Sequence, residues 1–218
     1  MAVIRLLPPD DLVPDALCIL LHGVGADAAS MQPLGMLLQS ACPTMAVVIP
    51  DAPERSDISS FGWQWFSVRG VTDQNRASRI DNALTPLKAF IASEQARYAL
   101  APARTGVGGF SQGAMMALAL ADHDLAPSAI AAIAGRIARP FAAATSSSPT
   151  ILLSHGALDP VVPFACMEEA EHAFLSAGYP VKAIAITDLA HSISPAQAMA
   201  LSAHFAATFA TTSLEPVA

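Results

Sequence analysis

Residues 109–113 read Gly109-Phe110-Ser111-Gln112-Gly113, a G-x-S-x-G pattern that follows the apolar run 105–107 and precedes the helix-like run 114–120. A serine at a sharp turn from strand to helix projects its hydroxyl above the sheet, and glycines beside it avoid clashes between a Cβ and neighbouring backbone. Read alone, the pattern fits an ordinary glycine-rich loop about equally well. Its position between a strand and a helix favours a nucleophilic serine at residue 111.

Short apolar runs recur along the chain, and segments with helical periodicity lie between them. Continuous apolar runs are typical of strands buried on both faces of a parallel sheet. The expected strands are Ala16–Leu21, Met45–Ile49, Thr105–Val107, Ala129–Ala134, Thr150–Leu153 and Val181–Ile186. The expected helices are Ala28–Ala41, Arg76–Tyr98, Ala114–Ala121, Pro163–Ala177 and Pro195–Phe209. This alternation predicts an α/β fold with a mostly parallel central sheet, helices on both faces and a single domain over residues 1–218.

A nucleophilic serine needs a neighbouring base, and the base needs an acid that orients it. In the chain order serine, acid, histidine, both partners follow the serine, which excludes His22 as the base. The candidate acid is Asp159, because it lies in a proline-flanked loop just beyond the expected strand 150–153. An aspartate before proline is also a common turn residue, and Asp188 is a rival acid.

The candidate base is His191, which lies between the last expected strand and the last expected helix. A loop in that place can carry a histidine over the carboxyl edge of the sheet. His155, at the end of a strand, and His172, inside a helix among glutamates, are alternatives that better fit structural roles. The order Ser111, Asp159, His191 favours His191 as the base.

Acyl transfer also needs hydrogen-bond donors for the oxyanion that develops on the substrate. One donor is expected to be the backbone N–H of Gln112, directly after the serine. The other is expected in the loop after an early strand, where residues 21–27 read Leu-His-Gly-Val-Gly-Ala-Asp. Because its glycines let backbone amides turn inward, we assign the second donor to Val24, although an ordinary glycine turn would have the same composition.

Five ordered motifs resemble those of the phospholipase/carboxylesterase family of serine hydrolases, which includes the acyl-protein thioesterases. They are Leu21–Asp27, Trp65–Ser67, Gly109–Ala114, His155–Pro163 and Ala190–Ser194, and Gly135–Ile137 further resembles the bacterial members. The resemblance implies a small single-domain α/β-hydrolase without a large lid domain. It also implies the same roles for Ser111, Asp159 and His191 as a triad, for Val24 and Gln112 as oxyanion donors, and no metal or organic cofactor.

The function that the resemblance implies is hydrolysis of carboxylic esters by a serine carboxylesterase, through an acyl-enzyme on Ser111. An acyl-thioesterase or lysophospholipase with incidental esterase activity is the alternative within enzymes. A binding protein that keeps a hydrolase fold without turnover is the alternative from another class.

An aromatic cluster, Phe61, Trp63, Trp65 and Phe66, lies in the long connection from Asp51 to Asn75. Part of it is expected to wall an acyl pocket, although a plug that packs this connection onto the core fits equally well. The expected substrate contacts are Trp65 and Val162.

Composition excludes several other classes of protein. The net charge is −7 and only 11 of 218 residues are Lys or Arg, which argues against binding to nucleic acid. The three cysteines are widely spread and have no metal-site spacing, which favours free thiols in a reducing cytoplasm. We expect no signal peptide and no membrane span, since Pro8 and Pro9 interrupt the first residues and the early apolar run is short. A mean hydropathy of +0.46 leaves a homodimer open.

Overall fold

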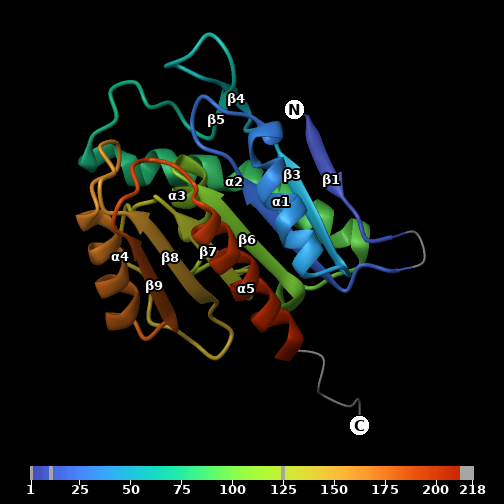
Figure 1. The fold of residues 1–218 in the computed structure, drawn as a ribbon. Helices are drawn as coiled ribbons and strands as arrows, with labels where there is room; N and C mark the ends of the chain where they lie inside the picture. Colours follow the sequence, from blue (N-terminus) through green and yellow to red (C-terminus); the bar gives the residue numbers. More distant parts are fainter. Residues whose placement is uncertain (1, 10–11, 124–125, 212–218) are drawn as a thin grey trace.

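The computed structural model describes residues 2–9, 12–123 and 126–211, and its core is a seven-stranded sheet (Figure 1). The strand order is β1-β3-β2-β6-β7-β8-β9. The bounds are β1 (Val3–Leu6), β2 (Ala16–Leu21), β3 (Met45–Pro50), β6 (Thr105–Phe110), β7 (Ala129–Ile133), β8 (Thr150–Gly156) and β9 (Val181–Ile186). β1 is antiparallel to β3, and every other neighbouring pair is parallel. The prediction of a mostly parallel sheet is confirmed.

The described part of the chain has five α-helices, four of them between strands of the sheet and the fifth after β9. They are α1 (Ala28–Ala41), α2 (Asp73–Tyr98), α3 (Gln112–Leu118), α4 (Ala165–Ser176) and α5 (Pro195–Thr211). A 3-10 turn, η1 (Pro102–Arg104), precedes β6, and a small two-stranded ribbon consists of β4 (Glu54–Arg55) and β5 (Trp63–Gln64). All five helices were predicted, whereas β1 and the ribbon were not, because their residues are few and only partly apolar.

The sheet separates two hydrophobic cores, and the alternation of side chains along β2 shows how. Leu17, Ile19 and Leu21 pack into a core with residues of α2, α3 and α4. Cys18 and Leu20 face the opposite way, into a core with residues of α1 and α5. Figure 1 shows α1 and α5 together on one side of the sheet. Helices therefore cover both faces, as predicted.

The last strand departs from the prediction of strands buried on both faces. β9 lies at the edge of the sheet and pairs only with β8 among the described strands. Its six residues are half-buried or exposed, whereas every residue of β2 and β3 is buried. An apolar run therefore identified β9 correctly as a strand but not as an interior one.

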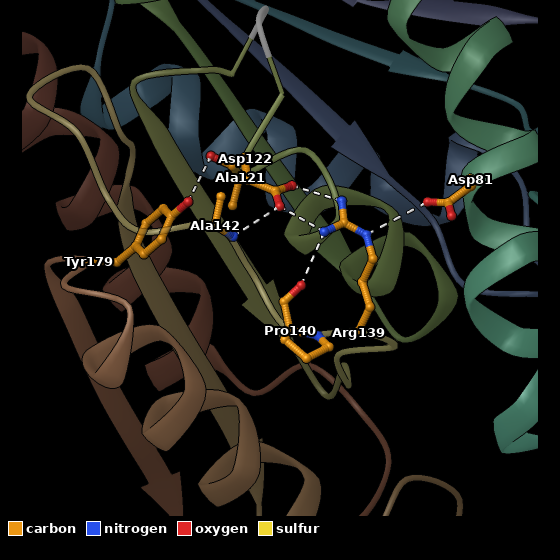
Figure 2. Close-up of polar contacts among 7 residues, drawn as sticks. All are labelled: Asp81, Ala121, Asp122, Arg139, Pro140, Ala142 and Tyr179. Carbon is orange, nitrogen blue, oxygen red and sulfur yellow. Dashed lines mark hydrogen bonds and ion pairs between the residues drawn. The ribbon is translucent and has the colours of Figure 1, made fainter.

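The connection between β7 and β8 is held by a bidentate ion pair, which Figure 2 shows. Arg139 Nη1 donates to Asp122 Oδ2 at 2.7 Å, and Arg139 Nη2 donates to Asp122 Oδ1 at 2.8 Å. The Nε of Arg139 also lies 3.8 Å from Asp81 Oδ1 on α2. The hydrogen bond from Arg139 holds the pKa of Asp122 below its ordinary value, although burial opposes this shift. The pair thus links α2, the turn after α3 and the β7–β8 connection.

We expect Arg139→Met to lower the free energy of unfolding at pH 7 by about 1–3 kcal/mol, because it leaves Asp122 without its charged donors. Since the folded-state pKa of Asp122 is lowered, its contribution is present above the unfolded pKa of about 3.9. It is lost as the pH falls through the lower folded-state pKa. Urea unfolding from pH 7 to pH 3 measures this loss.

Asp81→Asn is the control for that experiment, because the Asp81 carboxylate is half-exposed and more distant from Arg139. An exposed ion pair contributes about 0–1 kcal/mol, so a small effect is expected. A difference between wild type and Arg139→Met that does not change with pH would contradict the role given to the Asp122 charge.

Candidate active site

Ser111 lies at the turn between β6 and α3. Its dihedral angles are φ 54° and ψ −116°, a backbone conformation that residues other than glycine rarely adopt. Its N–H still donates to Ile133 O at 2.9 Å, so the residue continues the pairing of β6 with β7. Its C=O already accepts from Met115 N at 3.1 Å, which starts the helix. The chain therefore changes from strand to helix at this one residue, and such strain costs about 1–3 kcal/mol.

Two glycines permit this turn because backbone passes very close to them. A Cβ placed on Gly113 would lie 2.1 Å from the carbonyl oxygen of Leu21, at the end of β2. A Cβ on Gly109 would lie 2.4 Å from the carbonyl carbon of Gly113. No side chain fits at either distance. The G-x-S-x-G stretch is thus a tight strand-to-helix turn and not an ordinary glycine-rich loop.

Three side chains from distant parts of the sequence meet at the carboxyl edge of the parallel strands. His191 Nε2 lies 3.0 Å from Ser111 Oγ, and His191 Nδ1 lies 2.7 Å from Asp159 Oδ2. Ser111 follows β6, Asp159 follows β8 and His191 follows β9. The Phe110 ring packs against the His191 ring, with centroids 4.8 Å apart. Loops after parallel strands commonly converge in this way at one edge of a sheet.

The carboxylate of Asp159 is fully buried and its two oxygens have different partners. Oδ1 accepts from the backbone N–H groups of Val161 and Val162, at 2.8 and 2.9 Å. Oδ2 faces His191. Burial by itself would raise the pKa of Asp159, but the hydrogen bonds from His191, Val162 and Val161 outweigh it, and the pKa lies below its ordinary value. The acid is therefore held in its charged form and in one orientation.

A second histidine, His155, lies against this acid. Its Nε2 is 2.8 Å from the carbonyl oxygen of Val162 and 3.2 Å from Asp159 Oδ2. Since a carbonyl oxygen only accepts hydrogen bonds, Nε2 carries the proton and points it toward both oxygens. Sequence reasoning gave His155 a structural role at a strand end but did not foresee its contact with the acid. The spacing of His155 and Asp159 in the sequence did not indicate this contact, because it forms only when the loop after β8 folds back over the histidine.

The rival candidates lie elsewhere. Asp188 and His172 are both exposed. His22 is buried, and its Nδ1 lies 2.7 Å from Gly23 O, while its Nε2 accepts from Ala52 N at 2.9 Å. Burial lowers the pKa of His22, which keeps the ring neutral and able to accept that hydrogen bond. Ser111 Oγ hydrogen-bonds to His191 and to none of these three side chains.

The turn after β2 lies beside the serine, as the assignment of Val24 requires. A Cβ on Gly23 would be 3.3 Å from the Cβ of Ser111. In this turn Gly25 N donates to Trp63 O and Ala26 N donates to Gly23 O. Within the described residues, the N–H groups of Val24 and Gln112 donate to no acceptor. Both are therefore free to donate to a ligand.

The aromatic cluster of the 51–75 connection does not stay together. Trp65 and Phe66 are buried in the core, at 4% and 5% exposure, whereas Phe61 is 78% exposed. Trp63 is half-buried, and the Cζ atom of Arg55 lies over its ring, 3.9 Å from the ring centroid. Val162, the other expected substrate contact, is also 4% exposed. Packing onto the core thus describes Trp65 and Phe66, and substrate contact by Trp65 and Val162 stays a prediction.

The described residues contain neither a cluster of metal ligands nor a membrane-spanning helix. No group of three His, Cys, Asp or Glu side chains in residues 2–9, 12–123 and 126–211 could hold a metal ion. In the same part of the chain, no helix has the length and apolar character needed to cross a membrane. The three cysteines, Cys18, Cys42 and Cys166, are free thiols.

Comparison with known proteins identifies the family. Residues 9–209 match the model of the phospholipase/carboxylesterase family. This chain belongs to that family. The resemblance found in the motifs is confirmed, and family membership makes the chain an α/β-hydrolase that acts on ester bonds.

Two esterases and an acyl-protein thioesterase are among the proteins that are similar to this chain. Esterase YpfH of Escherichia coli (strain K12) is 36% identical over 179 residues, which are 81% of this chain and 76% of that protein. The crystal structure of esterase PE8 has a TM-score of 0.83 and 29% identity, and covers 92% of this chain and 95% of its own. Acyl-protein thioesterase 2 of Zea mays, with a TM-score of 0.73, 21% identity and coverage of 95% and 99%, shares the fold.

The tight turn generates a prediction about stability. We expect Gly113→Ala to lower the free energy of unfolding by more than about 3 kcal/mol, because the new Cβ overlaps the carbonyl of Leu21 and neither backbone can yield cheaply. Thermal unfolding with soluble yield measures the effect. Gly70→Ala is the control: Gly70 also has a positive φ, of 66°, but a Cβ there meets nothing closer than 4.0 Å. It should cost only about 1 kcal/mol, and equal losses in the two variants would contradict the proposed clash.

Proposed function

We propose that this chain is a serine carboxylesterase that hydrolyses carboxylic esters through an acyl-enzyme on Ser111. One observation carries the proposal: the line of contacts from Ser111 Oγ to His191 Nε2, 3.0 Å, and from His191 Nδ1 to Asp159 Oδ2, 2.7 Å. Serine, histidine and aspartate in this arrangement form the charge-assisted system that makes a hydroxyl nucleophilic. The named activity of the E. coli relative, an esterase, supports the same reaction.

The first half-reaction transfers the acyl group to the enzyme. Ser111 Oγ attacks the carbonyl carbon of the ester while His191 Nε2 takes the hydroxyl proton. The imidazolium that forms is stabilised by Asp159 Oδ2, to which Nδ1–H donates. The carbonyl oxygen becomes an oxyanion and accepts from the N–H groups of Val24 and Gln112. The C–O bond to the alcohol then breaks, and Nε2–H returns its proton to the leaving oxygen.

The second half-reaction releases the acid. Water takes the place of the alcohol and loses a proton to His191 Nε2 as its oxygen attacks the acyl carbon. The same two amides hold the second oxyanion, and the proton returns to Ser111 Oγ when the acyl-enzyme bond breaks. Each oxyanion donor is worth about 3 kcal/mol of the barrier, which makes the free amides of Val24 and Gln112 as important as the base. The reaction as written needs no metal or cofactor.

The finer assignments belong to this proposal. The substrate is a small acyl ester, and preference for a thioester or a lysophospholipid remains the alternative. Residues 1–218 are proposed as one domain. Three free cysteines, two of them buried, favour a reducing cytoplasm over an oxidising compartment. A homodimer stays a prediction.

We expect Ser111→Ala to lower kcat on p-nitrophenyl esters by at least about four orders of magnitude, because it removes the nucleophile and leaves the fold in place. A fluorophosphonate probe should label wild type at Ser111 and should not label the variant. Mass spectrometry of the labelled peptide identifies the site. Ser146→Ala, in the exposed β7–β8 connection, is the control and should label normally. Folded wild type without an adduct would favour a binding protein that has kept a hydrolase fold.

We expect Asp159→Asn to lower kcat by about 10³–10⁴-fold, since an amide cannot stabilise the imidazolium of His191 and favours the wrong tautomer. Asp188→Asn makes the same chemical change on the exposed rival and should leave kcat within about twofold. Steady-state kinetics of both variants on one ester decides the assignment. The opposite pattern, with loss only in Asp188→Asn, would transfer the role of the acid to Asp188.

A further inference from the structure

The side chain of Gln112 links the nucleophile turn to the connection that precedes α2. Its Oε1 accepts from Trp65 N at 2.8 Å, and its Nε2 donates to Phe66 O at 2.7 Å. Both hydrogen bonds are buried, and Gln112 is 2% exposed. The side-chain amide therefore pairs with one donor and one acceptor of a segment 46–47 residues away. Neither a hydrocarbon nor a carboxylate side chain could satisfy both groups.

The same segment is also linked to the turn after β2. The indole Nε1–H of Trp65 donates to His22 O at 2.9 Å, and the Trp65 and His22 rings pack with centroids 5.5 Å apart. His22 in turn donates from Nδ1 to Gly23 O at 2.7 Å, and this carbonyl belongs to the same peptide group as the N–H of Val24. Trp65 thus binds Gln112 of the nucleophile turn through its backbone N–H, and the turn after β2 through its side chain. We call the side chains of Gln112, Trp65 and His22 the clamp.

Such a link has a function because the two proposed oxyanion donors come from different segments. Pairing of β2 with β6 fixes their relative position only as far as Leu21 and Gly109. Val24 lies three residues beyond the paired part of β2, and Gln112 three residues beyond that of β6. An oxyanion hole requires both N–H groups about 2.7–3.1 Å from one oxygen, and positions held within about 0.5 Å.

We propose that Gln112 and Trp65 are positioning residues that hold the two oxyanion amides in register through their side chains. This inference rests on the proposed function, because it concerns the amides of Val24 and Gln112 in the same reaction. It assigns to Trp65 a role in the alignment of the site, in addition to its packing in the core. The clamp acts on the transition state, in which the oxyanion forms, and leaves binding of the neutral ester unchanged.

The test uses Gln112→Met, which keeps the length of the side chain and removes both hydrogen bonds. We expect kcat on a p-nitrophenyl ester to fall about 10–100-fold, with KM within about threefold of wild type. A trifluoromethyl ketone, which forms a tetrahedral adduct with an oxyanion, should lose affinity by the same factor as kcat/KM. A purely structural role would not produce this proportional loss.

Gln64→Met is the matched control. Gln64 is also 2% exposed, and its side chain binds Asp57 N and Glu54, within its own connection, and not the nucleophile turn. It should lower the melting temperature as Gln112→Met does but leave kcat within about threefold. Equal losses of kcat in the two variants would overturn the proposal, as would a folded Gln112→Met with unchanged kcat and ketone affinity.

Trp65→Phe keeps the inference testable if Gln112→Met does not fold. It keeps an aromatic ring in the core and removes the indole N–H that donates to His22 O, together with the rest of the five-membered part of the indole. We expect a smaller loss of kcat, about 3–30-fold, again with a matching loss of ketone affinity. Unchanged values in this folded variant would overturn the proposal. Fluorophosphonate labelling of wild-type Ser111 tests the proposed function separately from the clamp. If wild type is not labelled, the proposed function is wrong. If wild type is labelled and the clamp variants keep their kcat, only the positioning role is wrong.

Discussion

The close approach of two backbones, at Gly113 and Leu21, sets the geometry of the whole site. The turn after β6 passes so near the end of β2 that a Cβ on Gly113 would lie 2.1 Å from Leu21 O. The chain must therefore enter α3 at once, and Ser111 takes its strained dihedral angles as a result. The same approach brings the turn after β2 beside the serine. Strain at Ser111 and the nearness of the proposed oxyanion amides thus have one cause.

Asp159 shows how a buried charge is both tolerated and used. A fully buried carboxylate is costly unless hydrogen bonds satisfy it. Two backbone amides occupy Oδ1, and His191 and His155 lie at Oδ2. Because Oδ1 is fixed by its own loop, Oδ2 can face His191 in only one direction, and this sets the proton on Nδ1. The free electron pair of Nε2 then points to Ser111. The loop between β8 and α4 therefore determines the tautomer of His191.

The sequence revealed those features that depend on local pattern and chain order. Continuous apolar runs identified the six parallel strands. The order of serine, acid and histidine predicted Asp159 and His191 in preference to Asp188 and His172, and the structure brings Asp159 and His191 into contact with each other. Features that depend on pairing between distant segments were missed. β1 carries Arg5 and only half-buried residues, so no apolar run marked it. The contact of His155 with Asp159 and the side-chain hydrogen bonds of Gln112 do not produce any periodic pattern in the sequence.

The position after the serine is variable in the G-x-S-x-G pattern, but in this chain the side chain of Gln112 has a requirement of its own. Any residue except proline supplies a backbone N–H after the serine, so the proposed oxyanion donor places almost no demand on the side chain. The side chain must instead satisfy Trp65 N and Phe66 O at once, through two buried hydrogen bonds. Only a primary amide of this length does so. The backbone and side chain of one residue thus meet separate requirements, and the alignment of Val24 with Gln112 follows from the second of them.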